Sequence, residues 1–445
     1  MINLLEGGDF ITEGKSEKAV LVGIEIPGNH LMNTEASLEE LAELAKTAGA
    51  DVLDKLIQKR TRPDSAYYMG KGFAEELGLR VQGLKANLII VDEELSGTQI
   101  RNLEETTGVR VIDRTTLILD IFAQRAKSRE GKLQVELAQL NYRLPRLTGL
   151  GLQLSRLAGG IGTRGPGETK LETDRRHLKN RINDIKKQIA RVSQQRRIKS
   201  QSRNPNTPFI VLIGYTNAGK SSIRYRLLRE VPAVGQNISN EDQGTDKLFA
   251  TLDPTIRGIR LNNGREILIG DTVGFIQKIP HQLVTAFKTT LDEVLDADLL
   301  LHVVDISNPF VKEQQEAVYK VLEEIGAVKI KRITIYNKID LVDLKVLPKP
   351  PDQSPYLAFS AKTGQGLNDL LDLIEKELPE KKVIIKILLP FSQGKIVSDI
   401  HNNCSIIETR YTPEGIYFKL EVPFYFYPAI KKFLAKESII QNFPE

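Results

Sequence analysis

Residues 209–230, FIVLIGYTNAGKSSIRYRLLRE, decide the fold. An apolar run of the strand type leads into GYTNAGKS at 214–221, which matches G-x-x-x-x-G-K-S, and a helical pattern follows. In such a loop the glycines let the backbone wrap around phosphates, the lysine neutralises the β- and γ-phosphate oxygens, and the serine hydroxyl reaches Mg²⁺. The stretch therefore predicts a phosphate-binding loop for ATP or GTP, made by Gly214, Asn217, Ala218, Gly219, Lys220, Ser221 and Ser222.

The residues after this loop repeat the same rhythm of strand and helix. Strand-like segments alternate with helical stretches up to residue 379, namely ILIGD (267–271), LLLHVVD (299–305), RITIYNK (332–338) and YLAFSA (356–361). This alternation is typical of α/β proteins with a doubly wound, mainly parallel sheet. We expect this P-loop domain to span residues 206–379.

The segments at the two ends of the chain predict smaller domains. Residues 1–120 alternate apolar runs such as KAVLVGIEI and ANLIIVD with helical patterns, so we expect an α/β domain there. Ser37 and Glu40 predict a capping box at the start of its first helix. Residues 380–445 contain the period-two stretch IYFKLEV and a helical pattern from about Pro428, which predicts a small α+β domain.

Residues 121–200 predict a helical hairpin. Aliphatic residues recur at alternating spacings of four and three in the segments 133–147 and 178–192, a pattern typical of two helices that pack along one seam. Between them lies GGIGTRGPGETK at 159–170. No strand precedes this stretch and no Gly-Lys-Ser/Thr ends it, so it does not fit a second phosphate loop. We expect a loop presented at the tip of the hairpin.

Basic charge is concentrated in this hairpin. Between residues 124 and 204 there are 20 Lys and Arg against 6 Asp and Glu, whereas the rest of the chain carries 42 against 51. A basic block inside an otherwise acidic protein favours a polyanionic partner, and nucleic acid is the first candidate. A solvated basic coiled coil is the alternative.

Three further motifs select the nucleotide. Asp271 and Gly274 of DTVG follow a strand, where the carboxylate can hold a magnesium shell and the glycine N–H can reach a γ-phosphate. NKID at 337–340 supplies a carboxylate that can accept two N–H bonds from guanine, which adenine cannot match. SAK at 360–362 can close over the base. The motifs together indicate GTP, with guanine contacts from Asn337, Lys338, Asp340, Ser360, Ala361 and Lys362.

The composition argues against a disulfide-bonded protein, an integral membrane protein and a metal-dependent enzyme that modifies RNA. The single cysteine, Cys404, excludes an internal disulfide and favours a cytoplasmic location. No apolar run approaches the length of about 18 residues that a membrane span needs, and the first residues lack the pattern of a secretion signal, so we expect no integral membrane segment. The five histidines are scattered, which argues against a metal-dependent enzyme that modifies free RNA.

The motifs resemble one family, the HflX-type ribosome-associated GTPases of the Obg-HflX group in the translation-factor-related P-loop class. The glycine-rich signature discriminates this family, since the other motifs occur in many GTPases. Two departures stand out. The helix after the phosphate loop reads SSIRYRLL, where family members tend to have an apolar residue and an asparagine near Arg224–Arg226, and DPTIRG replaces the commoner DPTTR. The similarity covers nearly the whole chain, through GGIGTRGPGETKLETDRR (159–176), GYTNAGKS (214–221), FATLDPT (249–255), DTVGFI (271–276), ADLLLHVVD (297–305), NKID (337–340) and SAK (360–362).

The resemblance implies a GTP-hydrolysing switch that binds the large ribosomal subunit and its rRNA, and that separates or rescues ribosomes with hydrolysis driving release. It also implies that Thr251 reaches Mg²⁺ only while the γ-phosphate is present, beside Ser221 and the shell held by Asp271. Asn217 matches a position that helps to hold K⁺ in related GTPases, and the alternative is that it satisfies a turn. We expect RNA contacts, and none to DNA, at Gly159, Gly160, Gly162, Arg164, Gly165, Gly167, Arg175 and Arg176.

An alternative function stays open at this point. The chain could be an RNA-binding anti-association or ribosome-maturation factor in which GTP sets the conformation and turnover is secondary. A hydrolysis-dead form that still performs the cellular task would favour this alternative over the switch.

Overall fold

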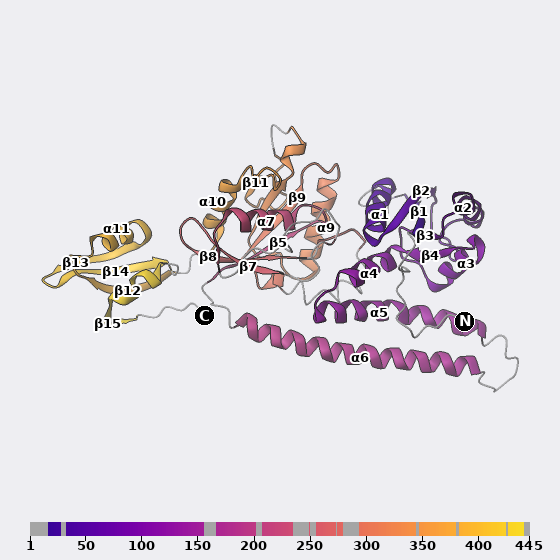
Figure 1. The fold of residues 1–445 in the computed structure, drawn as a ribbon, viewed down its shortest axis with the longest axis horizontal. Coiled ribbons are helices and arrows are strands. Elements are labelled where there is room, and N and C mark those ends of the chain that lie inside the picture. Colours follow the sequence, from indigo (N-terminus) through magenta and orange to yellow (C-terminus); the bar gives the residue numbers. More distant parts are fainter. Residues whose placement is uncertain are drawn as a thin grey trace.

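The computed structural model describes residues 17–27, 33–154, 166–201, 207–234, 249, 255–272, 274–278, 293–343, 347–379, 382–423 and 426–439. These residues build three sheets that lie in a row, which we call the N-terminal, central and C-terminal units (Figure 1). A long helical hairpin runs beneath the N-terminal and central units (Figure 1). The predicted fold class, a P-loop α/β unit between an α/β unit with a hairpin and a small α+β unit, is confirmed.

The N-terminal unit is a parallel sheet with helices on both faces. Its strands lie in the order β2-β1-β3-β4. Alternate residues of the strands face opposite sides, so one core forms against α1 and α4 and another against α2 and α3. The elements are β1 (Glu17–Glu25), α1 (Thr34–Ala48), β2 (Ala50–Lys59), α2 (Lys71–Leu84), β3 (Leu88–Val91), α3 (Gly97–Thr107), β4 (Arg110–Asp113) and α4 (Arg114–Arg125).

Helix α1 begins earlier than the sequence predicts. Asn33 is its N-cap and accepts a hydrogen bond from the N–H of Ala36 at 2.7 Å through its side-chain oxygen. The predicted capping box is wrong, because Asn is as good an N-cap as Ser and takes that role four residues upstream of the predicted N-cap, Ser37. Ser37 and Glu40 instead lie inside the helix, where Ser37 donates to Asp92 at 2.5 Å and Glu40 accepts from Arg114 at 2.9 Å.

The helical hairpin consists of α5 (Arg129–Leu154) and α6 (Pro166–Gln201), which run antiparallel as predicted (Figure 1). The predicted seam forms its core, in which Leu133, Leu137, Ile182 and Ile185 are buried. Helix α6 already begins inside the glycine-rich stretch, because proline is favoured in the first turn of a helix. Residues 155–165 therefore connect the two helices, and the last part of GGIGTRGPGETK belongs to α6.

The central unit contains the doubly wound sheet in the order β11-β10-β9-β5-β8-β7-β6. Neighbouring strands are parallel except for β7, which is antiparallel to β6 and β8. The chain changes direction across the sheet between β5 and β9, and such sheets bind ligands at the carboxyl ends of the strands beside this point. The elements are β5 (Phe209–Gly214), α7 (Lys220–Glu230), β6 (Ala233–Val234), β7 (Ile256–Arg260), β8 (Glu266–Asp271), β9 (Leu299–Asp305), α9 (Val311–Glu324), β10 (Arg332–Asn337), η2 (Ile339–Leu341), β11 (Tyr356–Ala358) and α10 (Leu367–Glu377).

The C-terminal unit is an antiparallel sheet in the order β13-β14-β12-β15. The expected final helix is wrong for most of its length, since it stops after one turn and the chain continues as a strand. The open edge of β12 explains this result, because Ile385 and Ile387 pair with Ile439 and Leu434, and pairing overrides local helix propensity. The elements are β12 (Lys382–Leu389), α11 (Gly394–Asn403), β13 (Ser405–Thr412), β14 (Gly415–Pro423), α12 (Tyr427–Ile430), η3 (Lys431–Phe433) and β15 (Leu434–Ile439).

Candidate nucleotide site

The phosphate-loop sequence lies at the carboxyl end of β5, between Gly214 and the start of α7. Gly219 is the N-cap of α7 at φ 95°, a left-handed conformation that favours glycine, and a Cβ built on it would lie 2.2 Å from Nδ2 of Asn337. Asn217 is left-handed too, at φ 60°, which asparagine tolerates better than most residues. Asn217 therefore suits the turn whether or not it also binds a cation.

Lys220 is directed into the loop. Its Nζ donates to the carbonyl oxygens of Gly214 at 3.0 Å and Tyr215 at 2.7 Å. Burial lowers the pKa of Lys220 to about 8, although the nearby carboxylate of Asp271 acts in the opposite direction. The amine thus lies at the base of the loop, where phosphate oxygens would further favour its charged form.

Two residues predicted to act at the magnesium site, Ser221 as a ligand and Asp271 in the shell, meet here from separate elements. The hydroxyl of Ser221, in the first turn of α7, donates to Oδ2 of Asp271 at the end of β8 at 2.7 Å. A hydroxyl and a carboxylate are both oxygen donors, which fits the preference of Mg²⁺. Ser222 follows in the same turn and is half-buried, whereas Thr251 lies outside the described residues.

Asn337 links the phosphate loop to the predicted base-binding loop. Its side chain is buried, and Nδ2 donates to the carbonyl of Ala218 at 2.8 Å. Its Oδ1 accepts from the N–H of Ala361 at 3.0 Å. One side chain thus holds the two loops at a fixed separation.

The other residues predicted to bind guanine surround this link. Asp340 accepts a hydrogen bond from the Ser360 hydroxyl at 2.6 Å, which orients its carboxylate. Lys338 is left-handed at φ 66° and its amine pairs with Asp305, at the end of β9, at 2.6 Å. The structure therefore brings Asn337, Lys338, Asp340, Ser360 and Ala361 to the same edge of the sheet.

Arg226 is a site residue that the sequence motifs do not assign, although it lies in the stretch of α7 where the sequence departs from the family pattern. Its guanidinium donates to the carbonyl of Ala361 through Nε at 3.1 Å and through an NH2 group at 3.0 Å, and it also donates to the carbonyl of Lys362. Arg226 thus ties α7 to the base-binding loop.

Gly274 and Phe275 lie directly against the phosphate loop. A Cβ on Gly274 would lie 2.8 Å from Cγ2 of Thr216 and 2.9 Å from Nζ of Lys220, so only glycine fits this close approach. Phe275 is buried in the core of the central unit. Its ring therefore lies among apolar residues and cannot orient a water molecule.

The predicted RNA contacts are only partly described. Gly159, Gly160, Gly162, Arg164 and Gly165 lie outside the described residues. Gly167 is in the first turn of α6, and Arg175 and Arg176 are exposed farther along this helix.

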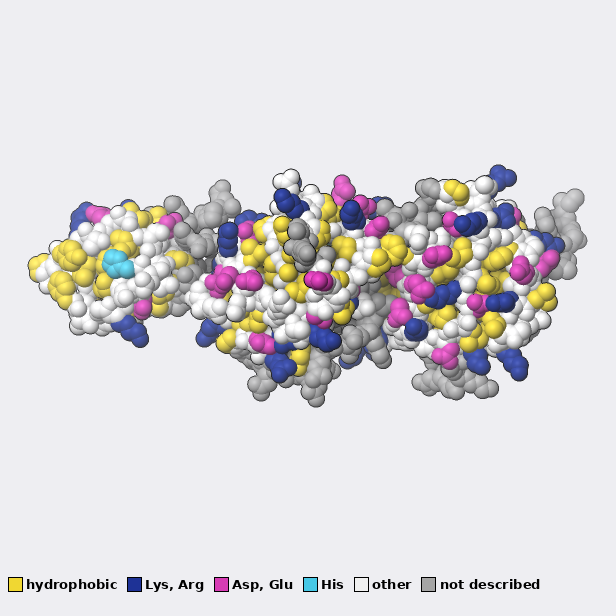
Figure 2. Space-filling model, turned by 90° about the horizontal axis from the view of Figure 1, so that it is seen from above, with side chains coloured by type: hydrophobic (Ala, Val, Ile, Leu, Met, Phe, Trp, Pro, Cys, Tyr) yellow, Lys and Arg dark blue, Asp and Glu magenta, His cyan; other side chains and the backbone are white. Residues whose placement is uncertain are grey.

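On the face seen in Figure 2, which views Figure 1 from above, acidic and basic side chains are interspersed.

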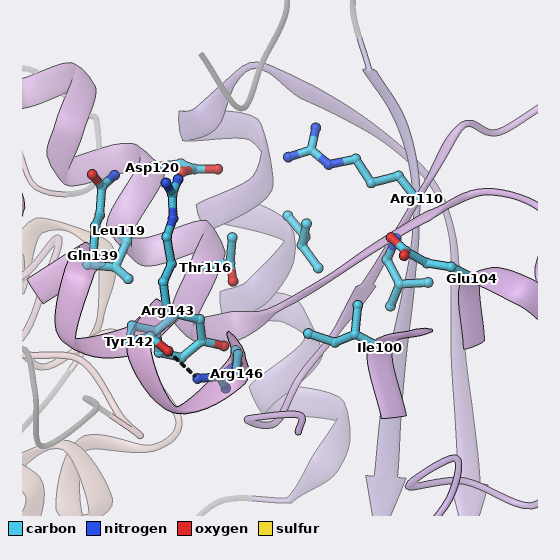
Figure 3. A pocket seen from close by; sticks show the side chains of 12 residues that line it. Ile100, Glu104, Arg110, Thr116, Leu119, Asp120, Gln139, Tyr142, Arg143 and Arg146 are labelled. Atoms are coloured by element: carbon cyan, nitrogen blue, oxygen red, sulfur yellow. Dashed lines mark hydrogen bonds between the residues drawn. The ribbon is translucent and has the colours of Figure 1, made fainter. Parts of the chain in front are cut away.

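A pocket of about 240 Å³ in the N-terminal unit is separate from the nucleotide motifs (Figure 3). Apolar residues of β4 and α4 and charged residues of α3 and α5 line it. Arg143 points toward Asp120 (Figure 3), and burial raises the pKa of Asp120 to about 7. Its walls supply none of the residues predicted to bind GTP.

Two features concern metals and membranes. Among the residues that the structure describes, no group of three or more His, Cys, Asp or Glu side chains could hold a metal ion by itself. Within the same ranges, every helix is too short or too polar to cross a bilayer.

Comparisons with known proteins cover most of the chain. Three family models match, described as GTP-binding GTPase N-terminal (35–123), GTP-binding GTPase Middle Region (125–203) and 50S ribosome-binding GTPase (209–338). The GTPase HflX of Caldanaerobacter subterraneus is 48% identical over 95% of both chains, and that of Lacrimispora saccharolytica is 45% identical over 92% of this chain and 94% of the relative. A solved GTP-binding protein of Sulfolobus solfataricus in complex with GDP is 25% identical, with a TM-score of 0.43 over 81% of this chain and 98% of that chain.

Proposed function

This chain belongs to the HflX family of GTPases, and from that premise we propose that its cycle of GTP binding and hydrolysis controls its association with the large ribosomal subunit. The GTP-bound form binds the rRNA of that subunit and separates or rescues ribosomes, and hydrolysis to GDP and phosphate releases it. In this proposal residues 121–200 form the RNA-binding domain and residues 206–379 the nucleotide-binding domain, between an N-terminal domain (1–120) and a C-terminal domain (380–445).

The observation that carries this proposal is the basic hairpin. Helix α6 has 36 residues, so it is about 54 Å long at about 1.5 Å per residue. It carries exposed arginines at 175 and 176 and follows the glycine-rich connector. Basic side chains attract the phosphate backbone of RNA, and glycines permit close approach to it. The hairpin can therefore carry residues 155–165 deep into a surface of rRNA.

The nucleotide site supports a mechanism in which the chain mainly binds and orients GTP. We propose that Lys220 turns from the loop carbonyls to the β- and γ-phosphates, while the N–H of Gly274 meets the γ-phosphate. Mg²⁺, held by Ser221 and Thr251 with Asp271 in its shell, would neutralise phosphate charge when bound. Asp340 would accept the guanine N–H bonds, between Asn337, Lys338 and the 360–362 loop.

Phe275 favours the alternative function, an RNA-binding anti-association or ribosome-maturation factor in which GTP sets the conformation and turnover is secondary. It follows the glycine of D-x-x-G, where many GTPases carry the glutamine that orients the attacking water. A buried phenylalanine cannot do this, so intrinsic turnover should be slow unless a K⁺ ion at Asn217 or the ribosome completes the site. If a hydrolysis-dead variant still performed the cellular task, GTP would set conformation and turnover would be secondary.

The test replaces residues 155–165 with a glycine–serine linker of equal length and, separately, changes Arg164→Glu. GTP affinity and intrinsic hydrolysis should match the parent, because the replaced residues are none of those that the structure describes in contact with the phosphate loop or with residues 274–278. Hydrolysis stimulated by large subunits should fall sharply in the linker variant and measurably in the point variant. Lys312→Glu, an exposed reversal of charge on α9, is the matched control. If ribosomes stimulated the linker variant as well as the parent, the RNA role of the tip would be wrong.

A further inference from the structure

Two segments of the central unit contribute apolar side chains to the core of the N-terminal unit. Phe249 and Ile276 are both almost fully buried there, among residues of α1, α4 and α5. The ring of Phe249 meets that of Phe122, on α4, edge to face with centroids 4.5 Å apart. Phe249 lies two residues before Thr251 and Ile276 two residues after Gly274. The segments that change with the γ-phosphate in GTPases are therefore anchored outside the GTPase unit.

Charged side chains at the same contact between the two units also hold residues 277 and 278. Arg114, at the start of α4, is 1% exposed and pairs with Asp92 at 2.7 Å and Glu40 at 2.9 Å. The same guanidinium donates to the backbone carbonyl of Gln277 at 3.4 Å. Lys278, from the central unit, pairs with Asp92 at 2.8 Å and Glu93 at 2.6 Å. Breaking such a buried pair by removing one partner leaves an uncompensated charge, so these contacts strongly restrict residues 277 and 278.

Tyr215 joins this cluster to the phosphate loop. Its hydroxyl donates to Glu40 at 2.7 Å and accepts from the N–H of Gln277 at 2.8 Å. Beside it, the N–H of Thr216 donates to the carbonyl of Phe275 at 2.7 Å, and the N–H of Phe275 donates to the carbonyl of Gly214 at 3.1 Å. Residues 274–278 are thus held between the phosphate loop on one side and carboxylates of the N-terminal unit on the other.

We infer that Tyr215, Arg114 and Lys278 are positioning residues for GTP hydrolysis, through which the half-buried carboxylate of Glu40 and the buried carboxylate of Asp92 hold Gly274 beside Lys220. This inference rests on the nucleotide site proposed above. A Cβ built on Gly274 would lie 2.9 Å from Nζ of Lys220, so the backbone of Gly274 passes close to the amine, and a γ-phosphate between them could meet both. GDP lacks that phosphate, so loss of these contacts should affect the binding and hydrolysis of GTP but not the binding of GDP.

The test uses Lys278→Met and Tyr215→Phe in the full chain. Each removes polar contacts to the N-terminal unit while keeping most of the side-chain volume. We expect kcat for GTP to fall by about tenfold to 100-fold, the range that small displacements of a reacting geometry produce, and the preference for GTP over GDP to fall with it. GDP affinity and guanine selectivity should match the parent. Lys278→Arg, which keeps the charge, should restore most of kcat.

Arg146→Met is the matched control. It breaks the pair of Arg146 with Asp113, at 3.4 Å in the same unit, and the other hydrogen bonds of this guanidinium reach α5 and the loop before α3 rather than the central unit. It should leave kcat unchanged. Unchanged or faster hydrolysis in both test variants would overturn the inference, as would an equal loss of GTP and GDP affinity or a failure of Lys278→Arg to rescue. Loss of guanine selectivity in these variants would instead contradict the proposed base site.

Discussion

Asn337→Ala should uncouple the phosphate loop from the base-binding loop. The change removes two hydrogen bonds, from Nδ2 to Ala218 and from Ala361 to Oδ1, in a side chain that is 1% exposed. Each such bond contributes about 1 kcal/mol net, so the free energy of unfolding should fall by about 2 kcal/mol. In the variant, the carbonyl of Ala218 and the N–H of Ala361 have lost their partner, and a bound nucleotide would also keep water away from them. Each unsatisfied group then costs about 1–3 kcal/mol of binding free energy. GTP and GDP affinity should therefore fall by the same factor, about 30-fold or more, since about 1.4 kcal/mol is tenfold.

Equilibrium binding of GTP and GDP, together with urea unfolding, measures both effects. Asn263→Ala is the control, because Asn263 also accepts a backbone hydrogen bond, from Arg265 at 2.9 Å, but in the turn between β7 and β8. It should leave both affinities unchanged. The reasoning would be refuted if Asn337→Ala bound both nucleotides as tightly as the parent, or if it lost affinity for GTP alone.

Three further results follow from the same site. Asp340→Asn should shift the preference toward xanthosine nucleotides, whose 2-oxo group suits an amide donor, and retained GTP affinity would contradict the assignment of the base site. Burial lowers the pKa of Lys220 from 10.5 to about 8, and binding of GTP requires the charged amine, so GTP affinity should fall as the pH rises through about 8 and the free protein loses this charge. Equal GTP affinities at about pH 7 and 9 would contradict this prediction. Intrinsic hydrolysis should be slow, and faster in KCl than in NaCl at matched ionic strength if Asn217 helps to hold K⁺, so equal rates would exclude that role.

Sequence patterns were sufficient for the features that depend on neighbouring residues. The phosphate loop, NKID and SAK each depend on residues within a few positions of one another, and the sheet then brings them to one edge because its parallel strands end there. The two seams of the hairpin likewise follow from one repeated spacing. These parts of the fold and of the candidate site can be predicted from the order of the residues alone.

The features that the sequence did not predict depend on contacts between segments that lie far apart in the chain. Lys278 meets Asp92 across 186 residues of sequence, and no local pattern pairs them. Ser37 and Glu40 fit the spacing of a capping box, but the pattern could not reveal that Asn33 caps the helix and that both side chains turn toward Asp92 and Arg114. The terminal strand β15 forms because β12 offers an open edge, which is a property of the assembled sheet.

Sedimentation with ribosomes tests the central claim most directly. Intact ribosomes would be mixed with the protein and GDP, GTP or a non-hydrolysable GTP analogue, and then separated on a sucrose gradient. The account predicts that with the analogue the protein sediments with large subunits while the peak of intact ribosomes decreases, and that with GDP neither happens. Sedimentation that was independent of the nucleotide, or binding only to small subunits, would contradict it.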